Sequence, residues 1–556
     1  METRAEKAYK IYKACESKKF KSVSRYDLNK LYNVLCRIKK DTKYAKEIAE
    51  FNAPEGEPLE ILIEKYFYDY NNLYGLEIRD DLIEYENPDL TSGSFFKVDS
   101  FINEGGNLVK RAPTEFLAGE VAHVTVSLLS NETNSELYAP ILSLTAVTDD
   151  GEEINKTVRN SSLIEFDITL SRPGSAKFKV VVLDTDEKPI MSAESAYGGI
   201  LFSRKEISTT HCPPKDLRSF WEGEIDRLLK TNPCDTTADK YSGKVETIFD
   251  ISEKNRYKLV KLDTEYAERL KSLGQPAPTA EELCDYDIYE TNLKSPGPCP
   301  ATAYVSVPKR AAKRSIPIHF IFDGYGVRMP AAVCSENQIT VHCAHHGYEL
   351  CRDVKYYQDL WDSVCRNYCR GNGKVNSDFT DIHDCYPLYL LLRNLQMLRF
   401  LSDPSLSSSL NLLHKVWNGN VSMSGSSMGG FQTICGGALA SILRERTGAF
   451  TLTSLSAPSP AFGNVAGSTD NRVTSTFFTY KEGADYFDTA ILATLLDTQT
   501  DIPRASLGDE VCPITTITAI YNSIPKKARR EIRYIQNSSH GYLPDEEYQN
   551  WIVYND

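Results

Sequence analysis

The chain has 556 residues, of which 41% are hydrophobic and 25% charged, so it is long enough for roughly two to four domains with buried cores. Its formal net charge of −13 argues against nucleic acid as the main partner, because neutralising phosphates requires an excess of clustered Lys and Arg. The sequence contains neither a long apolar segment for crossing a bilayer nor an apolar export signal after its N-terminus. We therefore expect a cytoplasmic protein without a membrane partner.

The first part of the chain, residues 1–92, is predicted to be mostly helical. Leu28, Leu31 and Leu35 recur at helical spacing, and residues 1–50 carry twice as many Lys and Arg as Asp and Glu. This basic excess is typical of a solvated helical face. The aromatic cluster at residues 66–70 is expected to pack against a neighbouring domain rather than to bind sugars.

Short alternating runs predict a β-sandwich of immunoglobulin-like type over residues 93–205. The runs are separated by Asn, Asp, Gly and Pro turns, and they cover Val121–Leu129, Leu137–Val147, Leu163–Leu170 and Ala176–Leu183. Such a domain can bind carbohydrate or brace an enzyme domain. No cluster of Trp marks a binding face, so the sequence favours bracing.

Residues 206–556 have the pattern of an α/β domain. A helix is predicted after Pro213-Pro214, with Asp216 as its N-cap and Phe220 and Trp221 on its apolar face. From residue 316 onward strand-like and helical segments alternate, which predicts a mostly parallel sheet. The predicted segments are Ile316–Phe322, Gln338–Cys343, Tyr386–Leu401, Phe450–Leu455 and Ile532–Gln536.

The pattern Gly425-Ser426-Ser427-Met428-Gly429 lies between a strand-like run and a helical run. Glycines on both sides of a serine permit the tight strand-to-helix turn that exposes a nucleophile in front of a helix N-terminus. Ser427 is therefore the candidate nucleophile of a serine hydrolase.

An activated serine needs a base, and the base needs a carboxylate that fixes its tautomer. His540 is the only histidine after Ser427, and it follows a predicted strand. Eight acids lie between them, namely Asp470, Glu482, Asp485, Asp488, Asp497, Asp501, Asp509 and Glu510. Asp509 is favoured because it stands where a strand passes into a loop, although Asp501 and Pro503 suggest that this strand is interrupted. Asp488, expected within a helix, is the alternative.

Four blocks resemble the acetyl xylan esterase and cephalosporin C deacetylase family. They are Asp509-Glu510-Val511-Cys512-Pro513 with Ala519-Ile520-Tyr521-Asn522, Tyr486-Phe487-Asp488, the Ser427 turn and the Phe220-Trp221 helix. The resemblance covers residues 206–556. It implies an α/β-hydrolase fold that removes acetyl groups from xylo-oligosaccharides and small esters, with Ser427 as nucleophile, Asp509 as acid and His540 as base. The family often forms homo-oligomeric rings, so the resemblance also implies a homo-oligomer, unless the added N-terminal domains block that assembly.

The resemblance also implies an oxyanion hole made of the backbone N–H groups of Tyr325 and Met428. Two residues depart from the family pattern. Asp323 stands where the family has His, and Met428 replaces its usual Gln. A carboxylate facing the site would oppose an oxyanion unless it is paired or turned away.

A metal site is not expected, and neither is a cofactor. Fourteen Cys are scattered along the chain, and the one close pair, Cys365 and Cys369, has no second pair to complete a zinc site, so reduced thiols are expected. A second group of ligand-type residues comprises His342, Cys343, His345 and His346. The first two would point to opposite faces of a strand, and no further ligand stands at a suitable spacing.

The sequence thus predicts a serine esterase that acts on an oligosaccharide or small-molecule ester. Two other interpretations remain. A serine peptidase of the same fold would commonly carry a repeated propeller domain, and no internal repeat is found. A binding or scaffolding protein with an impaired hydrolase domain is favoured by Asp323 and opposed by the retained Ser, acid and His in the expected order.

Overall fold

The computed structural model describes residues 94–190, 195–237, 243, 256–326, 331–344, 346–360, 379, 381–468 and 480–556. The predicted N-terminal helical region, the Cys365 and Cys369 pair, His345 and Asp470 lie outside these ranges. The described chain forms two compact units. One contains the described residues up to Arg204 together with Ser506–Glu510 and Ile535–Trp551, and the other contains Lys205–Ala505, Val511–Tyr534 and Ile552–Asp556.

The first unit is built around two four-stranded antiparallel sheets, which we call the sandwich. One has the order β2-β1-β3-β6, with β1 at Ser94–Glu104, β2 at Asn107–Lys110, β3 at Val121–Ser130 and β6 at Leu163–Thr169. The other has the order β5-β4-β7-β8, with β4 at Ala139–Thr148, β5 at Glu153–Ser161, β7 at Gly174–Leu183 and β8 at Ala196–Phe202.

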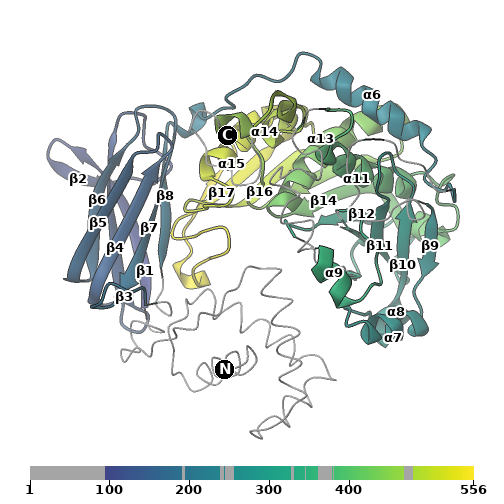
Figure 1. Ribbon diagram of the computed structural model, residues 1–556, viewed down its shortest axis with the longest axis horizontal. Coiled ribbons are helices and arrows are strands. Elements are labelled where there is room, and N and C mark those ends of the chain that lie inside the picture. The colour runs from purple at the N-terminus through teal and green to yellow at the C-terminus, as the bar shows by residue number, and fades with distance from the viewer. Residues whose placement is uncertain are drawn as a thin grey trace, which may run out of the picture. The chain divides into compact units, whose positions relative to one another are not determined.

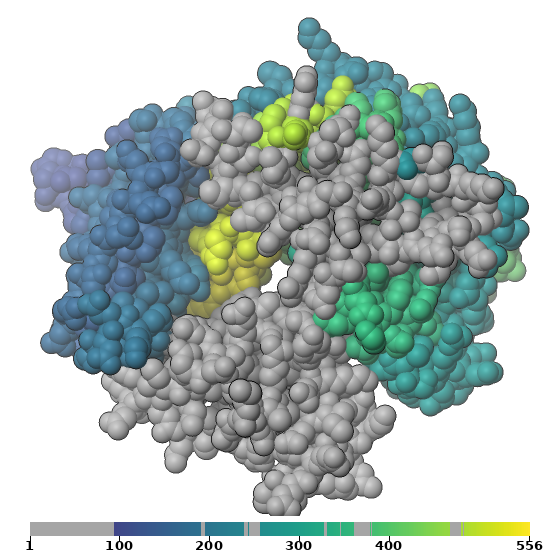
Figure 2. Space-filling view, in the orientation of Figure 1, coloured from purple at the N-terminus to yellow at the C-terminus, as the bar shows by residue number. Residues whose placement is uncertain are grey.

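Alternate side chains of both sheets meet in one apolar core, which includes Val124, Val126, Leu142 and Val180. Period-two alternation buries one face of each strand and exposes the other. The β1–β2 hairpin projects from the sandwich (Figure 1), and in Figure 2 it is the exposed purple protrusion.

The second unit is built around a ten-stranded sheet of order β18-β17-β16-β15-β14-β12-β13-β11-β10-β9. Its strands are β9 Lys258–Lys261, β10 Tyr286–Leu293, β11 Ala301–Pro308, β12 Ile316–Phe322, β13 Ile339–Ala344, β14 Trp417–Gly425, β15 Thr451–Ser456, β16 Gln499–Ser506, β17 Arg530–Ile535 and β18 Trp551–Tyr554. The pairs from β9 to β11 and β13 are antiparallel, and those from β13 through β12, β14 and β15 to β16 are parallel. The protein is therefore mixed α/β.

Helices cover this sheet. They are α6 Leu217–Lys230, α7 Thr264–Ser272, α8 Ala280–Asp285, α9 Val354–Leu360, α11 Tyr386–Ser402, α12 Asn411–Val416, α13 Met428–Thr447, α14 Thr489–Ala493 and α15 Ile514–Ser523. α13 packs on β12, β14 and β15, α11 packs on β11 and α13, and α6 contacts both α11 and α13 (Figure 1). No helix in the described ranges is both long enough and apolar enough to span a bilayer.

Two local expectations need correction. Asp216 does precede α6, but its carboxylate makes no capping bond and accepts a hydrogen bond from the Tyr486 hydroxyl at 2.7 Å. β16 runs through Asp501 and Pro503 without a break. The carbonyl of Asp501 accepts from the N–H of Ala457, and Asp501 is the last residue of β16 in the ladder with β15. Because backbone groups alternate along a strand, the nitrogen of Pro503 faces the same side as that of Asp501. It lies beyond the end of the ladder, where no N–H is needed.

Candidate active site

The turn after β14 has the geometry of a nucleophile elbow. Only Ser426 and Ser427 separate β14 from α13, and Ser427 has φ +58° and ψ −119°, a conformation that L residues rarely adopt. Its N–H donates to Pro458 O at 3.1 Å, and its carbonyl accepts from the N–H groups of Phe431 and Ala461 at 3.0 Å. These bonds stabilise a strained turn that leaves the Ser427 side chain only half buried.

Close backbone approach explains the glycines on either side. A Cβ at Gly429 would lie 2.3 Å from Phe322 O, and a Cβ at Gly425 would lie 2.6 Å from Gly429 O. Neither position has room for a side chain. The pattern is therefore required by the packing of the elbow against the end of β12.

The two predicted oxyanion donors lie on the elbow and on the loop after β12. Among the described residues, no acceptor pairs with the N–H of Met428 at the start of α13. A Cβ on Gly324 would lie 3.8 Å from Ser427 Cβ, so the loop that carries Tyr325 runs beside the nucleophile. A tetrahedral oxyanion requires two such N–H donors beside the nucleophile.

The carboxylate of Asp323 is paired. Its Oδ2 lies 2.9 Å from Nε2 of His342, whose Nδ1 lies 2.8 Å from Ala331 O. The carbonyl can only accept, so Nδ1 carries a proton, and Nε2 needs a second proton to donate to an ionised Asp323. With both ring nitrogens of His342 protonated, the two side chains would form an ion pair with no net charge, which would remove the electrostatic objection to an oxyanion nearby.

The structure brings Asp509 and His540 together. Oδ2 of Asp509 lies 2.9 Å from Nδ1 of His540, the carboxylate is fully buried, and the side chain of His540 is 24% exposed. With its Nδ1 proton donated to Asp509, the imidazole of His540 would act as an acceptor at Nε2, which is the tautomer that a general base requires.

Ser427, Asp509 and His540 follow the carboxyl ends of β14, β16 and β17. β14, β15 and β16 pair in parallel, and the bonds Thr500 N to Arg529 O and Leu507 N to Ile535 O show that β17 has the same direction. Carboxyl ends of parallel strands meet at one edge of a sheet, where α/β proteins place their ligand sites.

His–carboxylate pairs are frequent in this protein, so the pair alone does not identify a site. The described chain also pairs His123 with Asp167, His211 with Asp485, His342 with Asp323 and His383 with Glu224. The Asp509–His540 pair differs from them because its two residues follow β16 and β17, which are neighbouring strands of the sheet that contains β14.

The alternative acid, Asp488, is committed to backbone groups. It is the N-cap of α14 rather than a residue within a helix, and its carboxylate accepts from the N–H groups of Asn464, Val465, Ala490 and Ile491. Asp497 likewise pairs with Arg444. Both carboxylates serve the local fold.

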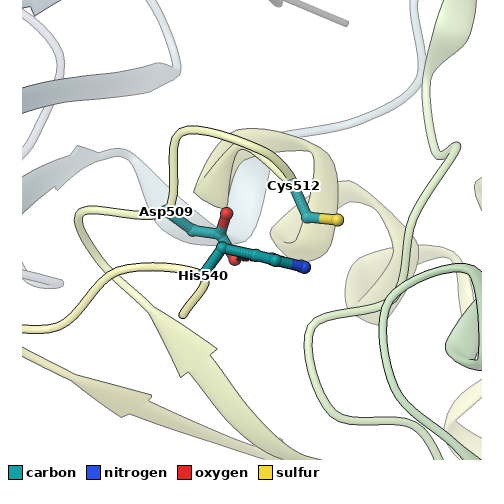
Figure 3. A group of neighbouring side chains, drawn as sticks. All are labelled: Asp509, Cys512 and His540. Atoms are coloured by element: carbon teal, nitrogen blue, oxygen red, sulfur yellow. Dashed lines mark hydrogen bonds and ion pairs between the residues drawn. The ribbon is translucent and has the colours of Figure 1, made fainter. Parts of the chain in front are cut away.

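Cys512 is a neighbour that sequence analysis did not assign to the site. Asp509, Cys512 and His540 each offer one ligand-type atom, and these atoms lie within 4.8 Å of one another (Figure 3). Cys512 stands three residues after Asp509, just before α15, and that spacing is the only signal in the sequence. An oxygen, a sulfur and a nitrogen could hold zinc with a fourth ligand, although Nδ1 of His540 already faces Asp509.

The other residues considered for a metal have different partners. His346 Nδ1 lies 2.7 Å from the Tyr386 hydroxyl, and Cys343 is buried. The cysteines in the described ranges are free thiols.

No family model matches the sequence, and no curated protein matches it. Among solved structures, the chain is similar to acetyl xylan esterase 1 from Thermoanaerobacterium sp. JW/SL YS485, with 15% identity and a TM-score of 0.42 over 62% of this chain and 93% of the other. It is also similar to an acetyl xylan esterase from Paenibacillus sp. R4, with 14% identity and a TM-score of 0.41 over 62% of this chain and 95% of the other. A third similar structure is a protein assigned as a dienelactone hydrolase from Klebsiella pneumoniae subsp. pneumoniae MGH 78578, with 15% identity and a TM-score of 0.31 over 47% of this chain and 93% of the other.

Proposed function

We propose that this protein is a serine esterase of α/β-hydrolase fold that removes acetyl groups from acetylated carbohydrates or small esters. The observation that carries the proposal is the elbow at Ser427, with its positive φ, on the same sheet edge as the loops that bring Asp509 and His540 to 2.9 Å. The strand order also supports it, because a central parallel sheet presents the turn before α13 at its carboxyl edge.

In this proposal His540 removes the proton from Ser427 Oγ, and Oγ attacks the acetyl carbonyl. The N–H groups of Met428 and Tyr325 hold the tetrahedral oxyanion, and the imidazolium, stabilised by Asp509, protonates the departing alcohol. Water, deprotonated by His540, then attacks the acetyl-enzyme. The C–O bond to Ser427 breaks, Oγ regains the proton from His540, and acetate leaves.

The pairing of Asp323 with His342 favours an active enzyme over an impaired scaffold, since a protonated His342 neutralises the charge that would oppose an oxyanion. No metal or cofactor has a part in this mechanism.

Hydrolysis of an aryl acetate by the wild type and by Ser427→Ala tests the proposal. We expect serine-dependent turnover of the wild type and a loss of about 10⁴-fold or more in kcat for the variant. Equal turnover by both proteins would reject Ser427 as nucleophile. Cleavage of peptides without hydrolysis of acetates would instead support a peptidase.

A further inference from the structure

The edge strand of the sandwich, β8, is bonded to the segment that carries His540. β8 ends its sheet and so has backbone groups without a strand partner. The side-chain amide of Gln536 fills this place. Its Oε1 accepts from Gly199 N–H at 3.1 Å, and its Nε2 donates to Gly199 O at 3.0 Å. We call Ile535–Trp551 the base loop and Ser506–Glu510 the acid loop, and both belong to the same compact unit as the sandwich.

Asn537 makes a second connection, three residues before His540. Its Oδ1 accepts from the N–H of Tyr197 in β8 at 3.2 Å, and its Nδ2 donates to the carbonyl of Phe96 in β1 at 2.8 Å. One buried amide therefore connects the base loop to both sheets of the sandwich. Asn537 has φ +52°, a conformation that Asn tolerates better than most residues.

The acid loop lies against the same strand, backbone to backbone. A Cβ at Gly508 would lie 2.6 Å from Gly198 N, and a Cβ at Gly199 would lie 2.3 Å from Leu507 O. Gly508 also donates its N–H to Ser538 O at 3.0 Å, which joins the acid loop to the base loop. The residue before Asp509 is thus fixed by β8 and by the segment before His540.

Aromatic contacts extend this interface along the base loop. The rings of Phe95 and Tyr548 stack with centroids 3.9 Å apart, and the rings of Tyr197 and Tyr542 lie 5.7 Å apart. Contacts of the sandwich therefore lie on both sides of His540 in the sequence. A carbohydrate-binding module on a linker would have no such contacts.

From these contacts we infer that the sandwich is a positioning element of the catalytic site, in which Gln536 and Asn537 orient the base loop so that His540 meets Asp509. The expected effect on the reaction rate rests on the function proposed above, whereas the expected effect on the position of His540 does not. Proton transfer depends strongly on geometry, and a displacement of about 1 Å can lower a rate by about 100-fold.

The test compares Asn537→Gly with Asn134→Gly. Both replace an Asn of positive φ, but Asn134 is exposed on the sandwich surface. Gly removes the side-chain bonds without backbone strain. For Asn537→Gly we expect kcat for an aryl acetate to fall by about 10- to 100-fold with little change in KM, and the acid limb of the pH profile to move. The control should behave as the wild type does.

The ring resonances of His540, assigned in NMR spectra by their loss in His540→Gln, give a readout that needs no activity. We expect Asn537→Gly to shift them. An Asn537→Gly protein with wild-type His540 resonances and pH profile would overturn the inference. A wild type without esterase activity would reject the proposed function, and the NMR comparison would still decide the positioning role. Gln536→Ala serves the same comparison if Asn537→Gly does not fold.

Discussion

Oδ2 of Asp323, at the start of the loop that runs beside Ser427, lies 2.9 Å from Nε2 of His342, which stands 19 residues later in the sequence. The pair has a testable electrostatic consequence. His342→Gln removes the positive partner and leaves the carboxylate near the developing oxyanion, so kcat for an aryl acetate should fall by about tenfold or more. Asp323→Asn removes the negative charge and should change kcat by only a few-fold.

The double variant Asp323→Asn, His342→Gln restores neutrality and should recover most of the activity lost in His342→Gln. Steady-state kinetics of the four proteins form a double-mutant cycle. Additive effects of the two substitutions would mean that the pair has no coupled role.

Asp509 and Asp488 can be separated by matched amide substitutions. Asp509→Asn removes the charge that orients and stabilises His540, so kcat should fall by about 10³- to 10⁴-fold with little loss of stability. Asp488→Asn places an NH₂ group against backbone N–H donors, which should lower the free energy of unfolding by about 1 to 3 kcal/mol. Folded Asp488→Asn should keep most of its kcat. The reverse result would assign the acid to Asp488.

Cys512→Ala tests whether the thiol beside His540 is a nucleophile or a metal ligand. With Ser427 as nucleophile and no metal in the reaction, Cys512→Ala should retain kcat within about tenfold, and dialysis against a chelator should leave wild-type turnover unchanged. Cys435→Ala is a control for the loss of a buried thiol elsewhere. Loss of turnover in Cys512→Ala together with sensitivity to the chelator would indicate a metal held by Asp509, Cys512 and His540.

Stability should depend on pH through His319. Its ring lies between the hydroxyls of Ser422 and Ser424, each at 2.8 Å, and burial lowers its pKa below the usual 6.5. Below pH 6.5 the unfolded state then binds more protons than the folded state, so stability falls as pH decreases through this range. In thermal unfolding, His319→Gln should show a smaller decrease in Tm between pH 7 and pH 5 than the wild type. An equal decrease in both proteins would reject this role.

The elements that depend on local pattern could be predicted from the sequence. β12 has the predicted bounds, and the elbow after β14 follows from glycines in a recognisable spacing. Four sandwich strands match the predicted alternating runs within a few residues. β5 escaped prediction because it is mostly exposed, and β8 because its Gly198-Gly199 pair resembles a turn. Tertiary contacts explain why glycine is needed there, since a Cβ would meet Phe178 and Gln536 at Gly198 and Leu507 O at Gly199.

The candidate site likewise has features that could be predicted from the sequence and features that could not. Asp509 and His540 could be chosen because chain order and strand ends restrict them, and the structure brings them together. The pairing of Asp323 with His342 depends on the register of β12 and β13, which no local pattern specifies. Pro503 led to the wrong expectation that β16 is interrupted. The point at which the ladder with β15 ends depends on tertiary structure, and the local sequence does not specify it.

The first unit is assembled from segments that lie far apart in the sequence, and this affects where the gene can be divided. The acid loop and the base loop are encoded some three hundred residues or more after the sandwich, yet they fold with it. A gene fusion or a truncation made at residue 205 would therefore divide one compact unit and leave its later segments in the other product. A sandwich expressed alone would lack the two loops that carry Asp509 and His540 and that belong to the same compact unit.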